Sequence, residues 1–541
     1  MNVLILGGVA TGTKVAAKLK RDNFAAQVTI LTKSKDISYA GCGLPYYVGN
    51  LITEQKDLIV NTPESFAKLT GVNVITEAEV TKINPDKKEV EALHLTTKET
   101  QTYAYDKLVI ATGADPIKPP ITGIDLKGVY LMRTPEDAIN LHASLEAGEI
   151  KRAVVVGGGF IGLEVAENLA AQGVRVFIID MAEQILPGFD PEIANYVENH
   201  LADQGIMTFT GTKLEAILGE EKVEKVKTSR RPMKADAVVL AIGIRPNTAF
   251  LAETGIELAG NNAIVVNEQL ETNLKDIFAA GDCVVVNNML TGKEAYSPMG
   301  SSANIEGRIL AQNLNGNNIG FKGVLGTAVV KLPKLNVAKT GLTEDAAKAE
   351  GYDVATVVTV VDDKAHYYPD AGNFIVKMIA DRNTKKLLGL QVLGKGAVDK
   401  MVDMAVMAIA LNATLDEIKD LDFAYAPPFS TAIHPFSHTV NILLNKINGD
   451  LHSLTPREYQ AGKAEGYQVI DTAVTPGIAG VPFVDLAKVH GELPQFAKSD
   501  KLLLVCTKGK RAYMLQQRLK SFGYTNTLVL EGGTTFNEIN L

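Results

Sequence analysis

The chain has 541 residues, too many for one hydrophobic core, so three or four domains are expected. Its composition, 46% hydrophobic and 21% charged, is typical of a globular protein, and a net charge of -8 without a basic stripe argues against nucleic-acid binding. Three cysteines are too few for a disulfide framework, and no apolar run is long enough to span a membrane.

The first predicted unit is a strand, a glycine turn and a helix. The apolar strand at residues 3–6 has no charged leader ahead of it, which together with the few cysteines predicts a cytoplasmic protein. An apolar helix follows at residues 15–19. The turn between them contains Gly7, Gly8 and Gly12. Such a turn lets backbone N–H groups approach a pyrophosphate, although Val9 takes the middle glycine position and Thr32 replaces the usual acidic residue.

A lone cysteine, Cys42, stands in the segment that follows. A dithiol redox enzyme would carry a second cysteine five positions later, where this chain has Tyr47. Because a lone thiol cannot close an internal disulfide, a reactive Cys42 would cycle through a mixed disulfide, a persulfide or a sulfenic acid. Residues 43–47 are expected to open a helix whose N-terminus lowers the pKa of the thiol. An inert buried cysteine is the alternative, and the glycines and Pro45 around it argue against a packed strand.

The pattern of strand, glycine turn and helix returns at residues 153–166. Here all three fingerprint positions are glycines, namely Gly157, Gly159 and Gly162. The next strand ends at Asp180, about 20 residues on, where a carboxylate binds the ribose of a dinucleotide. No arginine follows Asp180 directly, which favours NADH over NADPH. Either glycine run alone is equally consistent with a structural turn, but two copies in matching contexts predict two nucleotide-binding folds.

The rest of the chain predicts two further kinds of domain. Three strands end in turns of small residues, at Thr112 and Gly113, at Gly243, and at Asp282. From about residue 321 to 445, strands alternate with amphipathic helices, and a methionine stripe at 401–407 is interpreted as core or interface packing. Near residue 450 the chain restarts as a small α/β unit, with parallel strands at 469–471 and 502–505 and a helix at 511–522.

Residues 1 to about 445 resemble a single-cysteine member of the pyridine nucleotide-disulfide oxidoreductases. The nearest branch contains the coenzyme A-disulfide reductases and the NAD(P)H-dependent persulfide or polysulfide reductases. Five motifs in the right order carry the resemblance, at residues 38–47, 105–113, 157–164, 277–282 and 425–430. Residues from about 450 to 541 resemble a rhodanese domain, with a loop at 506–511 that begins with Cys506.

The resemblance implies an α/β fold with four domains. Two Rossmann-like, glutathione-reductase-type domains would bind FAD (residues 1–115 plus 246–320) and NADH (116–245). An α+β dimerisation domain would span 321–445 and make the protein a homodimer, and a small α/β rhodanese domain would span 450–541.

The resemblance also implies where cofactors bind. FAD would lie beside Cys42, on Gly7, Gly8, Val9, Ala10, Gly12, Thr32, Thr112, Gly113, Asp282 and Ala303. NADH, with NADPH possible, would lie on Gly157, Gly159, Phe160, Ile161, Gly162, Asp180 and Gly243. Phe160 would gate the flavin ring, and Asp282 would bind the ribityl chain. The flavin edge, like the helix N-terminus, would favour the thiolate of Cys42. No metal site is expected.

The implied substrate is a small thiol, disulfide or persulfide, with coenzyme A as substrate or bound thiol. Positions that match substrate-binding residues are Lys18, Arg21, Ser38, Asn304, Arg308 and, in the rhodanese loop, Arg511. Tyr367 and Tyr425 match tyrosines that reach the redox cysteine from the other subunit, where a phenol can protonate a leaving thiolate. Core packing is an equally good interpretation of both tyrosines. Several departures near the expected channel, among them Gly41, Ile433 and His434, make coenzyme A less secure than the redox chemistry.

The rhodanese loop would hold a persulfide on Cys506 in a nest of backbone N–H groups. Lys508 and Lys510 would add positive potential that favours the thiolate. The alternative is a packing module that has lost its activity, because Thr472 and Ala473 stand where the family carries an arginine. Cys283 is interpreted as structural.

The leading hypothesis is an FAD-dependent reductase that uses NADH to reduce coenzyme A disulfide, coenzyme A persulfide or polysulfide through Cys42. Cys506 would be catalytic as a carrier of sulfane sulfur. The first alternative is an NADH oxidase or peroxidase that uses a sulfenic acid on Cys42. Ala10 argues against it, because related oxidases and peroxidases carry a histidine there. The second alternative is a redox sensor in which the flavin state alters binding to a partner.

Overall fold

The structure is a computed structural model of the chain and describes residues 1–539. The chain forms two compact units. The first, called here the nucleotide-binding unit, contains Met1–Pro187 and Leu201–Val324. The second, called the C-terminal unit, contains Gly188–His200 and the chain from Leu325 on.

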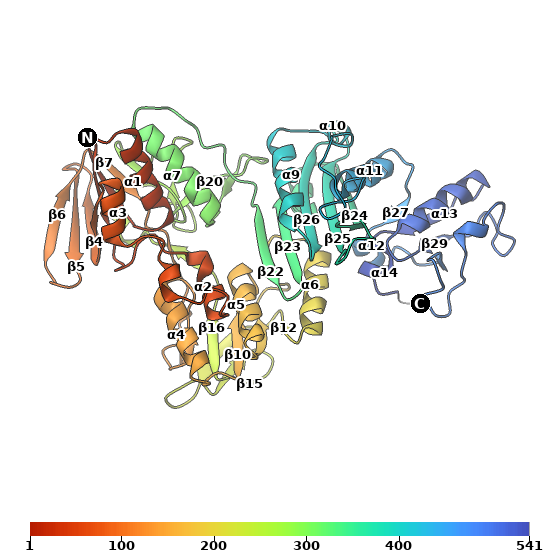
Figure 1. Cartoon of the computed structure of the whole chain (residues 1–541), viewed down its shortest axis with the longest axis horizontal. Helices are drawn as coiled ribbons and strands as arrows, with labels where there is room; N and C mark the ends of the chain where they lie inside the picture. The colour runs from red at the N-terminus through yellow and green to blue at the C-terminus, as the bar shows by residue number, and fades with distance from the viewer. Residues whose placement is uncertain (540–541) are drawn as a thin grey trace. The chain divides into compact units, whose positions relative to one another are not determined.

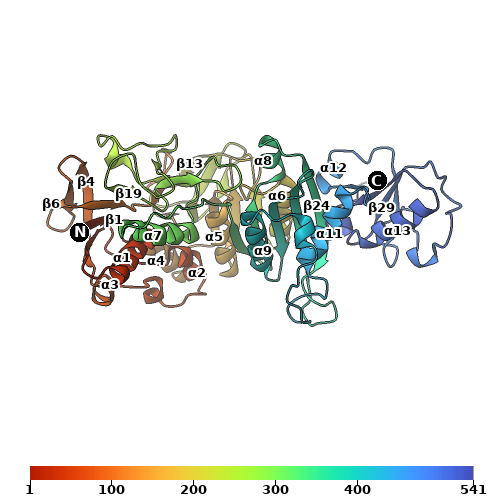
Figure 2. The ribbon, with the colours of Figure 1, turned by 90° about the horizontal axis from the view of Figure 1, so that it is seen from above.

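The nucleotide-binding unit begins with a parallel sheet in the order β19-β7-β1-β2-β3. Its strands are β1 (Asn2–Leu6), β2 (Gln27–Leu31), β3 (Asn73–Ile75), β7 (Lys107–Ile110) and β19 (Ile277–Ala279). Residues 3–6 are buried on both faces, as the continuous apolar run predicts. The accompanying helices are α1 (Ala10–Asp22), α2 (Leu44–Val48), α3 (Pro63–Thr70) and α7 (Gly300–Leu314). Figures 1 and 2 both show α1 and α7 side by side, in contact.

A second parallel sheet in the same unit has the order β12-β11-β10-β16-β9. Its strands are β9 (Val129–Tyr130), β10 (Arg152–Val156), β11 (Arg175–Ile179), β12 (Met207–Phe209) and β16 (Ala237–Leu240). The helices that follow β9 and β10 are α4 (Pro135–Glu146) and α5 (Phe160–Ala171). Each of the two sheets thus has a glycine turn and a helix directly after a central strand.

Short strands complete the nucleotide-binding unit. Two small sheets have three strands each and another has two, and all of them lie outside the parallel sheets. Their strands are β4 (Ala78–Asn84), β5 (Glu89–His94), β6 (Thr100–Ala104), β13 (Leu214–Leu218), β14 (Lys225–Thr228), β15 (Met233–Lys234), β8 (Ala114–Pro116) and β17 (Ile244–Pro246). A further sheet pairs β18 (Ile264–Val265), β20 (Val284–Asn287) and β21 (Glu294–Ala295).

The C-terminal unit contains an antiparallel sheet in the order β22-β23-β26-β25-β24. Its strands are β22 (Ala328–Leu332), β23 (Leu335–Gly341), β24 (Val354–Asp362), β25 (Asn373–Asp381) and β26 (Leu387–Gly394). Helix α9 (Val398–Ala410) packs on β23 and β26, and α11 (Pro435–Ile447) packs on β24 and β25. Two shorter helices are α8 (Glu344–Ala349) and α10 (Leu415–Ile418), and α6 (Pro191–Asp203) begins in this unit.

A small parallel sheet follows in the same unit, in the order β27-β30-β29-β28. Its strands are β27 (Ser453–Leu454), β28 (Gln468–Asp471), β29 (Leu502–Val505) and β30 (Thr527–Leu530). Its helices are α12 (Pro456–Gln460), α13 (Lys510–Ser521) and α14 (Gly533–Phe536). The α/β fold expected from the sequence is confirmed, whereas the bounds of the four domains stay a prediction.

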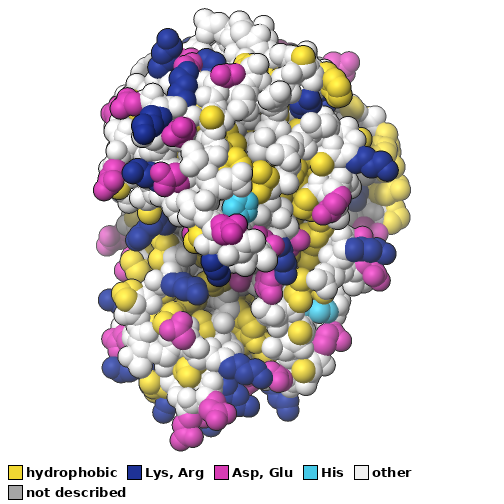
Figure 3. All heavy atoms as spheres, turned by 90° about the vertical axis from the view of Figure 1, so that its left-hand side faces the viewer, with side chains coloured by type: hydrophobic (Ala, Val, Ile, Leu, Met, Phe, Trp, Pro, Cys, Tyr) yellow, Lys and Arg dark blue, Asp and Glu magenta, His cyan; other side chains and the backbone are white. Residues whose placement is uncertain are grey.

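The surface carries charges of both signs. On the face drawn in Figure 3, basic and acidic side chains are interspersed. Among residues 1–539, no helix combines the length and the apolar character needed to cross a bilayer.

A buried lysine joins the start of α6 to the antiparallel sheet. Lys377 on β25 is fully buried, and its ammonium contacts Asp190, Glu192 and Glu344. Burial alone would lower the pKa of Lys377, but these three carboxylates outweigh it and raise the pKa above its usual value. The lysine therefore stays charged inside the protein.

Replacing Lys377 with Met leaves buried carboxylates without their cation. We expect the substitution to destabilise the C-terminal unit by roughly 3–5 kcal/mol. Thermal unfolding followed by circular dichroism measures the effect, and Lys386→Met, at an exposed lysine, is the matched control. Equal melting temperatures for the two variants would contradict the prediction.

Candidate functional site

Cys42 lies at the junction of the two nucleotide folds. It sits in a single 3-10 turn, Gly41–Gly43, is exposed to solvent, and is followed directly by α2, as the sequence predicted. Helix α2 packs against α4 and α5, and the Tyr46 hydroxyl donates a hydrogen bond to Glu164 Oε1 at 3.1 Å. The lone thiol is thus held at the start of a helix that contacts the second nucleotide fold.

The protein groups around Cys42 do not favour its thiolate. Although the residue is exposed, protein atoms around the sulfur displace water and raise the pKa of the thiol above its usual value. The carboxylates of Glu164 and Asp282 add to the rise, and the Arg133 guanidinium opposes it. The expectation that the helix N-terminus lowers this pKa is wrong for these surroundings. Desolvation is the largest cause of the rise, and helix α2 has only 5 residues.

The first glycine turn is shaped by close backbone contacts. A Cβ added to Gly7 would lie 2.1 Å from the carbonyl oxygen of Ala111, and one added to Gly12 would lie 1.9 Å from that of Gly7. Gly7 also has a positive φ of 111°. Glycine is therefore required for α1 to begin directly against the ends of β1 and β7.

The neighbours of this turn are the residues that the sequence predicted. Thr32 is buried beside Gly8, whose carbonyl oxygen accepts a hydrogen bond from the Ser38 N–H at 2.8 Å. Val9 is the residue before α1, and Ala10 is its first residue. The structure thus brings together the cofactor-binding candidates of the first fold.

The second glycine turn repeats this geometry and leaves open space in front of it. Added Cβ atoms would lie 2.2 Å from the Ala241 oxygen at Gly157 and 2.0 Å from the Gly157 oxygen at Gly162. At Gly159, by contrast, an added Cβ meets nothing within 4 Å. This space lies at the N-terminus of α5, where a pyrophosphate is stabilised. The cradle therefore fits a dinucleotide.

The other candidates of the second fold surround this cradle. Asp180 follows β11, and its Oδ2 accepts a hydrogen bond from the Gly158 N–H at 2.7 Å. Phe160 and Ile161 are the first two residues of α5, and Ile161 is exposed. Gly243 lies in the loop after β16 with a φ of 110°.

Asp282 has a partner that the sequence did not reveal. Its Oδ2 lies 2.9 Å from the Arg133 guanidinium, and a Cβ added to Gly113 would lie 3.5 Å from the same group. The neighbouring Thr112 donates from Oγ1 to the Asn247 carbonyl at 2.8 Å. Arg133 lies between β9 and α4 in no recognisable motif, and only its position in space connects it with Asp282.

Glu306 is a second residue that the sequence analysis missed. It lies on α7 close to Ala303, is almost fully buried, and accepts a hydrogen bond from the Gly281 N–H at 2.6 Å. Burial raises the pKa of Glu306 to about 8, so its carboxyl group is mostly protonated at neutral pH. A carboxyl in an amphipathic helix gives no sequence signal of burial. Ala303, the candidate beside it, is buried against Thr11.

The expected phosphate-binding residues lie on two adjacent helices. Lys18 and Arg21 are on α1, and Asn304 and Arg308 are on α7, which packs against it. Arg21 and Arg308 are exposed, whereas Lys18 is ion-paired with Asp22 on its own helix. Asn304 donates to the Gly300 carbonyl at 2.8 Å.

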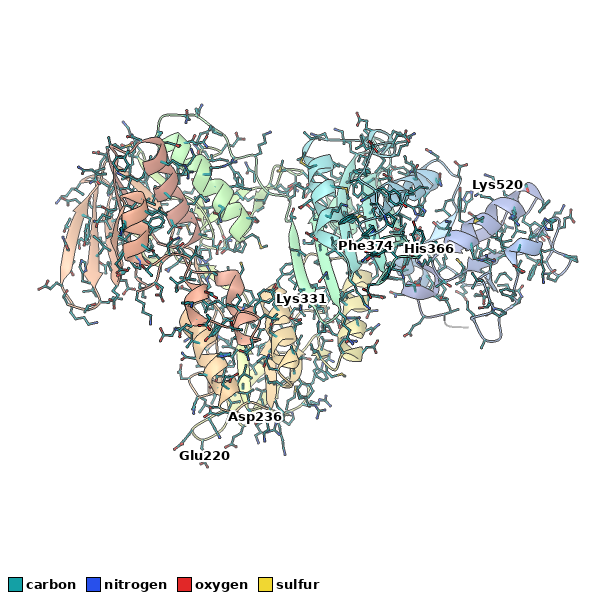
Figure 4. The ribbon with its side chains drawn as sticks, in the orientation of Figure 1. Glu220, Asp236, Lys331, His366, Phe374 and Lys520 are labelled. Carbon is teal, nitrogen blue, oxygen red and sulfur yellow. The ribbon has the colours of Figure 1, made fainter. Side chains whose placement is uncertain are left out.

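In the C-terminal unit, Tyr367 and Tyr425 lie together. Their hydroxyl oxygens are 3.5 Å apart, and both side chains are exposed. Tyr367 comes from the loop between β24 and β25, next to His366, whose ring it meets edge-on and which is labelled in Figure 4. Two exposed phenols that meet outside a core do not fit simple core packing.

Cys506 lies in the turn between β29 and α13. It is 3% exposed, and its Sγ accepts a hydrogen bond from the Gly509 N–H at 3.1 Å. Gly509 has a φ of 89°, which turns its N–H toward the sulfur. Behind the loop, a Cβ added to Gly533 would lie 2.0 Å from the Cys506 oxygen, so the loop is packed tightly. This geometry suits a thiolate or a persulfide held by a backbone N–H group.

The basic side chains Lys508 and Arg511 of this loop bind groups other than the sulfur of Cys506. The Lys508 ammonium binds Asp362 Oδ1 at 2.6 Å and Asn373 Oδ1 at 2.7 Å. The expectation that Lys508 adds free positive potential at Cys506 is therefore wrong, because its charge is paired with a carboxylate. Arg511 donates from Nε to the Thr472 carbonyl at 2.9 Å, which holds the segment where the family's usual arginine is absent.

The described residues, 1–539, contain no group of histidine, cysteine, aspartate and glutamate side chains that could hold a metal ion.

Comparison with known proteins supports this geometry. Residues 1–302 match the family described as pyridine nucleotide-disulphide oxidoreductase, and residues 327–435 match its dimerisation domain. An NADH oxidase of Methanocaldococcus jannaschii is 34% identical over 449 residues, which cover 83% of this chain and 100% of the relative. An NAD(P)H coenzyme A polysulfide/persulfide reductase of Pyrococcus horikoshii is 35% identical over 445 residues, 82% of this chain and 98% of that protein.

A solved structure extends the similarity to nearly the whole chain. The NAD-dependent persulfide reductase of A. fulgidus has a TM-score of 0.94 and 34% sequence identity, with 99% of this chain and 100% of the other covered. Paired glycine turns, a lone thiol between them and these matches lead to one conclusion: the chain belongs to the pyridine nucleotide-disulphide oxidoreductase family.

Proposed function

We propose that the protein is an FAD-dependent reductase that uses NADH to reduce coenzyme A disulfide, coenzyme A persulfide or polysulfide. The observation that carries the proposal is Cys42, an exposed free thiol that lies between the two glycine turns in the sequence and directly before a helix packed against the second nucleotide fold. Relatives that reduce coenzyme A polysulfide or persulfide support the same substrate class. FAD bound on the first fold would supply the redox chemistry, which is to accept hydride from NADH and to deliver the electrons to sulfur.

Different residues of the chain would bind the cofactors and carry out the sulfur chemistry. Gly7, Gly8 and Gly12, with Thr32 and Asp282, would hold FAD, and Asp180 would hold the ribose of NADH. The Cys42 thiolate attacks the sulfur–sulfur bond of the substrate, forms a mixed disulfide and releases one thiolate. Two electrons from NADH then cleave the mixed disulfide, which restores Cys42 and releases the second thiolate. The protein groups around Cys42 raise its pKa, so this mechanism needs a further group, such as the bound cofactor, to favour the thiolate.

The phenols would serve a partner subunit. We propose a homodimer in which Tyr367 and Tyr425 of one protomer face Cys42 of the other and protonate the leaving thiolate. The match to the dimerisation domain and the exposure of both side chains support this assignment.

Three free thiols that form no disulfide support a reducing compartment, which we take to be the cytoplasm.

Cys506 would carry sulfane sulfur on a rhodanese-like domain. A persulfide on Cys506 passes its outer sulfur to a thiolate, so that Cys506 becomes a thiolate and the acceptor becomes a persulfide. The N–H of Gly509 at the sulfur supports this role. Cys42 would then reduce the persulfide that is formed.

An NADH oxidase that forms a sulfenic acid on Cys42 is a second candidate. The relative from M. jannaschii favours it, whereas Ala10 supplies no acid or base for peroxide chemistry. Oxygen consumption at the rate of NADH loss, without a sulfur substrate, would favour this alternative.

Replacement of Cys42 by Ala should abolish reduction of coenzyme A disulfide. We expect a loss on the order of 10³-fold or more in kcat, because the attacking sulfur is removed. NADH consumption with coenzyme A disulfide, coenzyme A persulfide and polysulfide measures it. Retention of activity with all three would reject the proposed role of Cys42.

Replacement of Cys506 by Ala should separate the two sulfur sites. Transfer of sulfur from thiosulfate to cyanide should be lost, while reduction of coenzyme A disulfide stays within about twofold of wild type, since that step needs only Cys42. Equal loss of both activities would show that the sites do not act separately.

Replacement of Asp180 by Asn should weaken NADH binding without changing the chemistry. Losing the charged acceptor should raise the KM for NADH by roughly 10- to 100-fold and leave kcat largely unchanged. Glu220→Gln, at an exposed carboxylate labelled in Figure 4, is the matched control. An unchanged KM would place the ribose elsewhere.

A further inference from the structure

The side chain of Lys508 leaves the Cys506 loop and binds the antiparallel sheet of the C-terminal unit. Its ammonium lies between Asp362 Oδ1 at 2.6 Å and Asn373 Oδ1 at 2.7 Å. Asp362 ends β24 and Asn373 begins β25, and the two are direct partners in the register of these strands. Partners on one rung project from the same face of a sheet, so they form a ready-made pair of acceptors for one cation.

A second contact attaches the other side of the loop to the same strand. Glu531 is 3% exposed, and its Oε2 accepts a hydrogen bond from the Val358 N–H of β24 at 2.8 Å. Strand β24 is at the edge of its sheet, so this carboxylate satisfies an N–H that the sheet leaves free. Glu531 Oε1 binds Lys446 and Ser453.

The Cys506 loop lies between these two attachments. Glu531 is followed by Gly532 and Gly533, and the Thr534 N–H donates to the Cys506 carbonyl at 3.1 Å. Lys508 itself is two residues after Cys506 and one before Gly509, whose N–H reaches the sulfur. A shift of Lys508 would therefore move the only N–H group that the described structure places on Cys506 Sγ.

The strand ends that hold Lys508 also carry the loop with Tyr367. Residues 363–372 join Asp362 to Asn373, and Tyr367 reaches Tyr425 from this loop. The sulfur loop and the phenol loop are thus attached to the same rung.

We propose that Lys508 is a positioning residue, which fixes the Cys506 loop to the Asp362–Asn373 rung so that sulfane sulfur is held at a defined place relative to the Tyr367 loop. The proposal rests on the proposed role of Cys506 as a sulfur carrier. About a third of each partner of the ion pair is exposed (34% for Lys508 and 37% for Asp362), so the pair contributes little to stability and acts on the position of the loop.

The transfer that Lys508 supports conserves sulfur and charge. Thiosulfate gives its outer sulfur to the Cys506 thiolate and leaves as sulfite. The Cys506 persulfide then gives that sulfur to cyanide, which becomes thiocyanate, and the thiolate is restored. Neither step requires NADH or Cys42.

The test compares Lys508→Met with Lys508→Arg in the full chain, with Lys520→Met as the matched control at an exposed lysine on α13, labelled in Figure 4. Lys508→Met should lower sulfur transfer from thiosulfate to cyanide on the order of tenfold, because the N–H at the sulfur is displaced. Lys508→Arg, which still donates to both acceptors, should keep most of the activity. Reduction of coenzyme A disulfide by NADH should stay within about twofold for all three variants, because it depends on Cys42.

A second readout does not depend on activity. The rate of alkylation of Cys506 by iodoacetamide, with Cys42 as internal reference, should rise several-fold in Lys508→Met because the loop opens more often. Asp362→Asn, which leaves Lys508 unchanged, should give the same rise. If sulfur transfer and alkylation in Lys508→Met both stay within about twofold of wild type, the proposal is overturned. If the wild type transfers no sulfur, the role of Cys506 fails, and alkylation alone decides the role of Lys508.

Discussion

Both nucleotide folds depend on a backbone approach that only glycine permits. At Gly12 and at Gly162, an added Cβ would lie 1.9 and 2.0 Å from the carbonyl oxygen of the first glycine of the same turn. Without a side chain there, α1 and α5 begin directly against the ends of their strands and point their positive N-terminal ends at the ligand space. The position of Cys42 is linked to this packing, because α2, which directly follows the cysteine, packs against α5.

The protein groups around the lone thiol do not favour its ionised form. Loss of water and the carboxylates of Glu164 and Asp282 raise the pKa of Cys42, and Arg133 is the cation that opposes them. Arg133 is also ion-paired with Asp282, so much of its charge is neutralised by that carboxylate. The protein groups alone therefore raise the pKa of Cys42 above its usual value.

Cys506 in the C-terminal unit differs from Cys42 in its exposure and in its hydrogen bonding. Cys506 is buried, receives a backbone N–H at its sulfur and lies in a loop that is attached on both sides to β24. A buried sulfur that accepts a backbone hydrogen bond fits the proposed role of Cys506 as a sulfur carrier. The exposed Cys42 suits a thiol that must accept substrates of different size. The different exposure of the two sulfur sites is consistent with the proposal that Cys506 carries sulfane sulfur and Cys42 reduces it.

The sequence alone determined the α/β class, the two glycine turns, the helix after Cys42 and the loop that starts at Cys506, because each depends on local patterns such as glycine spacing, apolar runs and Pro45. It did not reveal Arg133 or Glu306, because these residues lie in no recognisable motif and interact with residues far away in the sequence. It also predicted the wrong direction for the effect of the protein groups on the pKa of Cys42, and it assigned the wrong role to Lys508. Those properties depend on burial and on carboxylates far away in the chain, such as Asp282 and Asp362. Local sequence determines which backbone can form, whereas only the tertiary structure decides which charges meet and how much water remains around them.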